Sequence, residues 1–231
     1  MNRTRVLILA VAAILGSVAF VWPATATEQA GAYRQRAAQD FNGMKGRQAI
    51  RTNPATVFNV GYVHFNQIDT GAQGGDFIAI GTAKGLGVDQ CPDRYSGSWS
   101  IYTDGMIAGV YFCREQDDDA YQAKTNPAFS ITYEYCPLVN SSRWVMSFGG
   151  TVWECIAATS NSGSRVAAAL ETTGPSTVDR NIDVKFNSVK TRHAGGSWVD
   201  FAAPGTHVVD PSYSVDTPFD GQINSYLAPL D

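Results

Sequence analysis

Carboxylates are the residues of this sequence best suited to acid–base chemistry. The run RVAAALET ends near Glu171, and on a strand Ala167 and Ala169 would share a face with that acid. An acid beside small apolar side chains can donate a proton, because desolvation disfavours its charged form. In the alternative interpretation, the alanines pack under another element and Glu171 reaches water, as it also would on a helix.

Nucleophilic and metal-assisted chemistry have less support. The three histidines, His64, His193 and His207, are not accompanied by a Gly-x-Ser-x-Gly elbow. The run REQDDDAY groups acids over residues 115–119, but it lacks the spacing of a calcium loop, and a solvated turn is the simpler interpretation. We therefore predict no metal and no cofactor.

The cysteines indicate disulfides rather than a zinc site. Cys91, Cys113, Cys136 and Cys155 predict two disulfides formed in an oxidising compartment. No pair has the short spacing of a zinc knuckle. Three pairings are possible, and the sequence does not choose among them, although pairing neighbours would close the shortest loops.

Residues 1–26 have the features of an export signal. Arg3 and Arg5 precede an apolar run over residues 6–21, and residues 24–26 (Ala-Thr-Ala) match the small-residue cleavage pattern. An uncleaved anchor helix is the alternative, but the run is short of the ~20 residues that span a bilayer comfortably. We predict a secreted protein without stable membrane insertion after cleavage.

The composition narrows the class of partner. Charged residues make up 16% of the chain and the net charge is −4. This balance argues against a nucleic-acid partner, which would need a basic stripe. An extracellular peptide or carbohydrate is the expected partner, and nothing indicates the oligomeric state.

The hydrophobic pattern predicts an all-β domain. FSITYEYC and NIDVKFN alternate apolar and polar residues, as half-buried strands do. About ten short strands, with turns between them, indicate an antiparallel β-sandwich or a concanavalin-like jelly roll. Tight hairpins are expected at Asp104-Gly105 and at Gly149-Gly150.

The chain divides into four predicted segments. Residues 1–26 are the signal peptide. Residues 27–55 are expected to form a short N-terminal helix, ending near Gly43 or Gly46, and a linker. Residues 56–203 form the β-sandwich, and residues 204–231 an extended tail on the surface.

A series of short motifs points to a known family. DFIAIG is followed by YTDG with AGVYFC, then by RWVMSFGGTVW, AALETTG, NIDVKFNSVK and SWVDF, over roughly residues 57–201. This order resembles the neprosin-type domain, a family of secreted glutamic peptidases with a lectin-like β-sandwich and many bacterial relatives of unknown activity.

The resemblance implies two catalytic glutamates, and one of them is missing. In FIAIGTA, Ala79 stands in the place of the first acid, and Thr82 stands where a tryptophan would follow. The second acid corresponds to Glu171. Hydrolysis needs one group to activate water and another to protonate the leaving group. Glu154, in TVWECI, is a candidate displaced partner, although a surface position across a strand pair is the simpler interpretation.

A binding module would need only exposed aromatic side chains on a concave face or loop. Trp99, Tyr102, Trp144 and Trp153 are candidate ligand contacts, although core packing is the usual role of aromatics in strands. A glycosidase would need two acids about 5–10 Å apart, and no alternating acid run occurs. From the matched strand order and the missing acid at Ala79, we predict a non-catalytic or catalytically degenerate domain that binds a peptide or glycan on one sheet face. The alternative is an acid-acting glutamic endopeptidase that uses Glu171.

Overall fold

The fold was obtained as a computed structural model, and within the residues that it describes every regular element is a β-strand. The described residues are 28–35, 40–50, 62–70, 75–84, 99–117, 126–158, 160–172, 183–202, 204–208 and 213–227. The predicted signal peptide lies outside them. No helix in the described part of the chain is long and apolar enough to cross a membrane.

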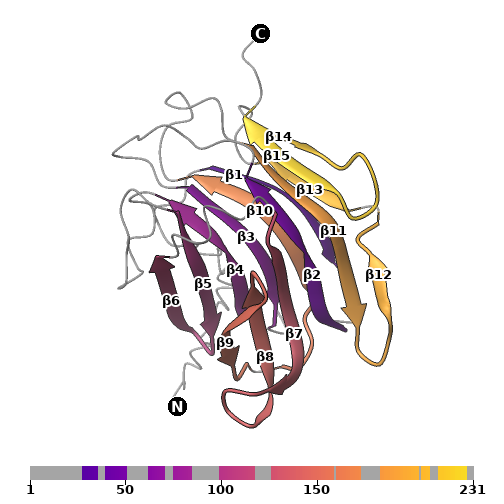
Figure 1. Ribbon diagram of the computed structural model, residues 1–231. Helices are drawn as coiled ribbons and strands as arrows, with labels where there is room; N and C mark the ends of the chain where they lie inside the picture. Colours follow the sequence, from indigo (N-terminus) through magenta and orange to yellow (C-terminus); the bar gives the residue numbers. More distant parts are fainter. Residues whose placement is uncertain are drawn as a thin grey trace, which may run out of the picture.

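The strands form two antiparallel sheets (Figure 1). In spatial order the seven-stranded sheet contains β13 (Gly205–Val208), β1 (Glu28–Gln35), β10 (Arg165–Thr172), β3 (Tyr62–Asp69), β4 (Phe77–Lys84), β5 (Trp99–Ile107) and β6 (Val110–Asp117). The eight-stranded sheet contains β14 (Tyr213–Asp216), β15 (Ile223–Leu227), β11 (Asp183–His193), β2 (Phe41–Ile50), β7 (Ala128–Cys136), β8 (Ser141–Phe148) and β9 (Thr151–Ile156), with β12 (Trp198–Asp200) paired to β11.

The core lies between the two sheets. Alternate residues of each strand point into it, so that Ile78 and Ile80 of β4 share one cluster with Ile131 of β7 and Met146 of β8. All four are fully buried, and burial of such a side chain contributes roughly 1.5–3 kcal/mol. The predicted all-β sandwich is confirmed.

Several local predictions are also confirmed. Gly149 and Gly150 connect β8 to β9 with φ angles of 62° and 89°, as a tight hairpin requires. Cys136 and Cys155 form a disulfide. Cys113 is disulfide-bonded as well, whereas Cys91 lies outside the described residues.

The predicted N-terminal helix is wrong, because residues 28–35 and 41–50 form β1 and β2. Helix propensity is a weak preference that tertiary pairing overrides. In β2 the glycines give room to crossing side chains. A Cβ at Gly43 would lie 2.8 Å from Trp198 Cη2, and one at Gly46 would lie 2.9 Å from the Phe129 ring.

The predicted hairpin at Asp104-Gly105 is also wrong. β5 continues through both residues, and the turn into β6 lies at Ala108 and Gly109, with φ angles of 51° and 76°. Gly105 serves close packing within the strand, since a Cβ there would lie 2.5 Å from the Phe77 carbonyl oxygen.

The C-terminal segment differs from the expected surface tail, because it joins both sheets. β13 pairs with β1 in the seven-stranded sheet, and β15 pairs with β11 in the other. Ile223 of β15 is fully buried and belongs to the core cluster. Residues after position 204 therefore contribute to the fold itself.

Candidate functional site

The outer face of the seven-stranded sheet carries the position at which the first acid was expected. Ile78 and Ile80 belong to the core, so Ala79 between them lies on the outer face. Antiparallel pairing aligns Ala79 with one residue of each neighbouring strand. We call this alignment the Ala79 row, and from β1 to β6 it runs Tyr33, Ala167, Gln67, Ala79, Asp104 and Cys113. It crosses strands that lie side by side in Figure 1.

Asp104 is the carboxylate of the Ala79 row. It is 6% exposed, and it lies between Ala79 of β4 and Cys113 of β6. The Tyr111 hydroxyl, from β6, donates a hydrogen bond of 3.3 Å to Asp104 Oδ2. A carboxylate can accept several hydrogen bonds, so Asp104 is a buried acceptor on this face.

Sequence reasoning missed Asp104 because an Asp-Gly pair is a strong turn signal. Alternation along the strand could have found it. Ile101 and Thr103 are buried on the core side, while Ser100 and Asp104 occupy the other face of β5. Continued period-two patterning across the pair was the sign that the strand does not stop there.

Small residues form the middle of this face. We call Ala79, Gly81, Ala167 and Ala169 the small-residue floor; they lie on the outer side of β4 and β10, with positions 65 and 67 of β3 in register between them. Ala79 and Ala169 are 2% and 7% exposed although neither belongs to the core cluster. Ala167 is half-buried, so it is the member of the floor that another chain can reach.

A second carboxylate on this face is held in an ion pair. Asp69, at the end of β3, is 5% exposed, and Arg165 Nε lies 2.9 Å from its Oδ2. The two residues are directly opposite in the register of β3 and β10. By strand spacing and rise, the Cα atoms of Asp69 and Asp104 are roughly 12 Å apart. The partner of Asp69 lies in β10, on the side of β3 away from Asp104, so the two acids do not converge on one water molecule.

Glu171 lies in β10, where it pairs with Gln29 of β1 and Val63 of β3. Its side chain lies outside the described part of the structure. Ala79 is two strands away and four residues along the register, which puts the two Cα atoms roughly 17 Å apart. The β10 residue that shares a row with Ala79 is Ala167.

Glu154 belongs to the other sheet. In β9 its Oε2 accepts a hydrogen bond of 2.7 Å from Arg114 Nη1, and the two side chains form an ion pair. Arg114 pairs in register with Thr103, which faces away from the Asp104 side of β5. Glu154 therefore lies at the edge of the sandwich, where β9 of one sheet meets β6 of the other. It does not lie on the outer face that carries Ala79.

The predicted aromatic contacts divide into two groups. Trp144 is fully buried, and its Nε1 donates to the Ser160 carbonyl oxygen at 2.7 Å. Trp153 is half-buried against the core, with Nε1 donating to the Phe148 carbonyl oxygen at 3.0 Å. These two contribute to packing. Trp99 and Tyr102 belong to β5, and their side chains lie outside the described part.

Among the side chains that the structure describes, no histidine lies on this face. His193 belongs to the eight-stranded sheet, where its Nδ1 lies 3.2 Å from Asp40 Oδ1 and its ring contacts Phe41. His64 and His207 have side chains outside the described part. Among the described residues, no group of three possible metal ligands occurs.

Comparisons with known proteins identify relatives by structure only. No protein-family model and no curated protein matches the chain. Scytalido-glutamic peptidase, solved with a peptide-based transition state analogue, is 11% identical, with a TM-score of 0.54. SCP-B, a member of the eqolisin family of peptidases solved with the tripeptide Ala-Ile-His, is 11% identical, with a TM-score of 0.51. Each likeness covers 87% of this chain and 98% of the other.

These likenesses establish a fold related to that of glutamic peptidases. At 11% identity they concern the fold alone, and they give no support to the neprosin-type domain over other families that share the sandwich.

Proposed function

We propose that this protein is an extracellular domain that binds an extended peptide on the outer face of the seven-stranded sheet without hydrolysing it. The observation that carries the proposal is the pair of alanines in the Ala79 row. Ala79 and Ala167 flank position 67 from the two sides, and neither can move a proton.

Peptide hydrolysis needs a base and an acid that reach the same water molecule and scissile bond. Asp104 and Asp69 are the carboxylates whose side chains the structure describes on this face, and each already has a polar partner. Their Cα atoms are roughly 12 Å apart by strand spacing. Asp69 is also paired with Arg165 of β10, on the side of β3 away from Asp104. The described part of the face therefore supports binding better than catalysis.

A peptide fits this face better than a glycan does. Ala167 is small and half-buried, so a second backbone can approach it, and we infer that the Asp104 carboxylate accepts an N–H group of the ligand. Trp144 and Trp153, the predicted aromatic contacts whose side chains the structure describes, belong to the other sheet and pack inward, so they offer no ring to a sugar on this face. The related fold of two peptidases solved with peptide ligands agrees with this choice.

The extracellular location rests on the disulfides and the export signal. The Cys136–Cys155 bond and the bonded state of Cys113 suit an oxidising compartment. Residues 1–26 supply the signal from which export is expected.

Binding to an immobilised library of random extended peptides tests the proposal. Asp104→Asn keeps the size of the side chain and removes its charge, so affinity should fall about tenfold or more. Ala167→Phe fills the floor and should have a similar effect. Asp220→Asn, the same change at an exposed position between β14 and β15, should have none. Equal binding by all variants would contradict the proposal.

The alternative function is an acid-acting glutamic endopeptidase that uses Glu171. Incubation with a denatured protein from acid to neutral pH separates the two. We expect no turnover by the wild-type chain. Turnover that disappears in Glu171→Gln would overturn the non-catalytic part of the proposal, whatever the peptide library shows.

A further inference from the structure

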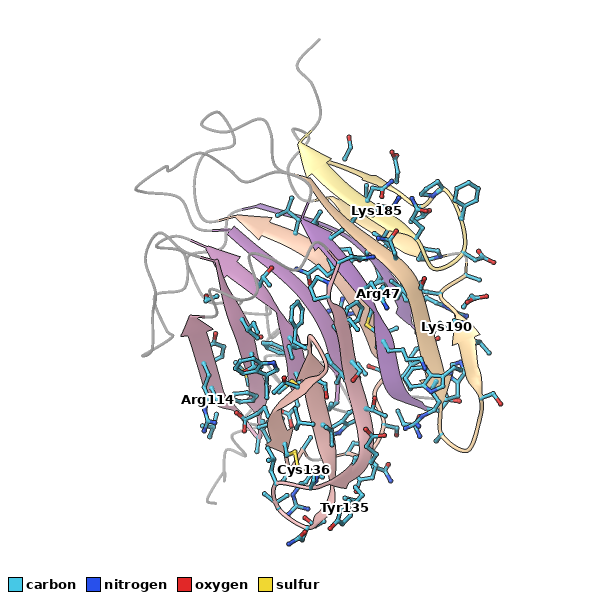
Figure 2. All side chains as sticks on the ribbon, viewed as in Figure 1. Arg47, Arg114, Tyr135, Cys136, Lys185 and Lys190 are labelled. Atoms are coloured by element: carbon cyan, nitrogen blue, oxygen red, sulfur yellow. A yellow bond between two sulfur atoms is a disulfide. The ribbon has the colours of Figure 1, made fainter. Side chains whose placement is uncertain are left out.

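We propose that the outer face of the eight-stranded sheet binds a linear acidic polysaccharide through cations of β2 and β11. We call these five cations the basic stripe, and they are Lys45, Arg47, Lys185, Lys190 and Arg192. Figure 2 shows Lys185, Arg47 and Lys190 along these two central strands, away from Arg114 at the β6 edge.

Strand register places the cations on one face. Lys45 pairs with Lys190, and Arg47 pairs with Asn187. Met44 and Gln48, which flank Lys45 and Arg47 in β2, are fully buried and face the core. The stripe therefore lies on the outer surface, on the opposite side of the molecule from the Ala79 row.

A β-bulge keeps both halves of β11 in this arrangement. Asn187 and Lys190 are three residues apart in β11, whereas their partners Arg47 and Lys45 are two apart in β2. The extra residue is accommodated where Ser188 has a φ of 52° and Val189 turns into the core. Without the bulge, Lys190 and Arg192 would point inward. The bulge therefore continues the line of cations beyond Lys185.

The charges of the stripe are only partly balanced. Lys190 Nζ lies 3.2 Å from Asp200 Oδ1, in a pair whose side chains are 41% and 58% exposed. Lys185 of β11 pairs with Asn224 of β15, and Asn224 pairs in turn with Asp216 of β14. Among the described side chains, Asp200 and Asp216 are thus the two acids in register with the five cations, although the chain as a whole carries a net charge of −4. Net charge averages over all faces, so the sequence composition did not reveal this stripe.

Like charges oppose one another directly at the centre of the stripe. Lys45 and Lys190 are register partners, an arrangement that destabilises a strand pair. An anion bound above them would relieve this repulsion. The stripe therefore binds an anionic ligand more tightly than a neutral ligand of the same shape.

Three of the cationic side chains are held in place before any ligand binds. Trp198 lies against Gly43, with Lys45 Nζ 4.3 Å and the Arg192 guanidinium 5.2 Å from its ring. Arg192 Nε also donates to Asn42 Oδ1 at 2.9 Å, and Arg47 Nη1 donates to the Asn126 carbonyl oxygen at 3.1 Å. Fixed side chains lose less conformational entropy when they bind a ligand.

The surroundings favour a polysaccharide over a nucleic acid. Ser130, Asn187 and Asn224 lie beside the cations and can hydrogen-bond to sugar hydroxyls. Single-stranded nucleic acids bind through aromatic platforms on which bases stack. Trp198 is the aromatic ring within the described part of this stripe, and its neighbourhood is occupied by two cations.

The test is a titration with polygalacturonate, a linear polyuronate, with neutral dextran and single-stranded DNA in parallel. We expect salt-sensitive binding to polygalacturonate and none to dextran. The triple variant Lys45→Gln, Arg47→Gln, Lys190→Gln should lose about tenfold or more in affinity and should show a shallower salt dependence. Arg143→Gln on β8, where Arg143 pairs with Glu134, removes the same type of charge outside the stripe and should change nothing.

Thermal unfolding midpoints establish that the variants are folded, and Lys190→Gln alone replaces the triple variant if that unfolds. Absence of salt-sensitive polygalacturonate binding would overturn the proposal. An equal loss in Arg143→Gln would overturn the stripe as the binding surface, and tighter binding to DNA would overturn the class of partner. Peptide-library binding through the Ala79 row should stay unchanged in the stripe variants, so the two proposals can fail separately.

Discussion

Gln48 Nε2 donates a hydrogen bond of 2.7 Å to Thr82 Oγ1 in the middle of the sandwich. Both residues are fully buried, and they come from β2 of one sheet and β4 of the other. Polar groups in a core are stable only when they are hydrogen-bonded. Thr82 is the residue that stands where the neprosin-type motif has a tryptophan, so at this position the chain has a polar link between its sheets.

Replacing Thr82 with valine removes the acceptor and keeps the shape of the side chain. We expect the free energy of unfolding to fall by about 1–3 kcal/mol, because the buried amide of Gln48 loses this partner. Urea denaturation measures the change as a lower midpoint at an unchanged slope. The double variant Gln48→Leu, Thr82→Val should be more stable than the sum of the single losses predicts, and strict additivity would contradict the coupling.

Gly163 is required where the entry to β10 contacts the start of β2. Its N–H donates to the Phe41 carbonyl oxygen at 2.6 Å, and its carbonyl accepts from the Phe41 N–H at 3.0 Å. A Cβ at position 163 would collide with the Asp69 carbonyl oxygen, which is backbone and cannot rotate away. Gly163→Ala should therefore destabilise the protein by about 1–3 kcal/mol or more.

Gly75→Ala is the matched control for this glycine. Nothing lies within 4 Å of the added Cβ, so the change in stability should stay within about 0.5 kcal/mol. Thermal or urea unfolding of both variants measures the difference in stability. Similar stability of the two variants would show that the backbone contact at Gly163 can relax.

The sequence predicted those strands in which local pattern and tertiary pairing agree. FSITYEYC alternates, and β7 buries Phe129 and Ile131 as the alternation requires. β2 could not be predicted, because its glycines are required by contacts with residues that are far away in the sequence. Gly43 accommodates Trp198, which is far away in sequence, and only the assembled sheet brings the two together.

The candidate site was predictable only in part, for a similar reason. Ala79 could be found from a motif, and its outward position follows from alternation along β4. Its row partners depend on strand order and register, which local sequence does not specify. The pairing of β10, β3 and β4 places Ala167, and not Glu171, in the same row as Ala79. The sequence alone does not give this pairing.

Glu154→Gln tests whether this acid has a role beyond the sheet edge. Its partner Arg114 is 67% exposed, whereas the Glu154 side chain is 13% exposed. Exposed ion pairs contribute about 0–1 kcal/mol, so the loss of stability should be small. Peptide-library binding should be unchanged, because Glu154 does not share a face with the Ala79 row. A folded Glu154→Gln protein that no longer binds peptide would place this acid at the ligand.

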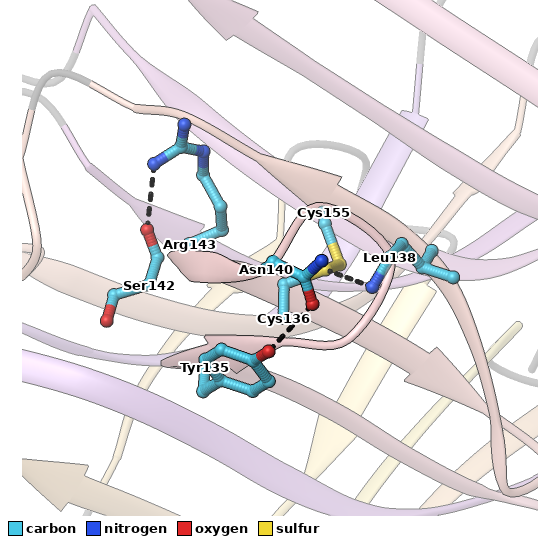
Figure 3. The surroundings of a disulfide bond; sticks show 7 residues. All are labelled: Tyr135, Cys136, Leu138, Asn140, Ser142, Arg143 and Cys155. Atoms are coloured by element: carbon cyan, nitrogen blue, oxygen red, sulfur yellow. Dashed lines mark hydrogen bonds between the residues drawn. A yellow bond between two sulfur atoms is a disulfide. The ribbon is translucent and has the colours of Figure 1, made fainter.

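The Cys136–Cys155 disulfide fixes the end of β7 to β9, across the β7–β8 hairpin (Figure 3). The two cysteines are 19 residues apart, and a loop of this size gives a stabilisation of about 3 kcal/mol in the chain-entropy model. The double variant Cys136→Ala, Cys155→Ala should lose about that amount, measured by urea denaturation under non-reducing conditions. Tyr135→Phe is the control, because it removes only an exposed hydrogen bond of 2.8 Å to Asn140 Oδ1, and its effect should stay within about 0.5 kcal/mol. A loss of stability below about 1 kcal/mol in the cysteine variant would mean that positions 136 and 155 stay close together in the unfolded chain without the bond.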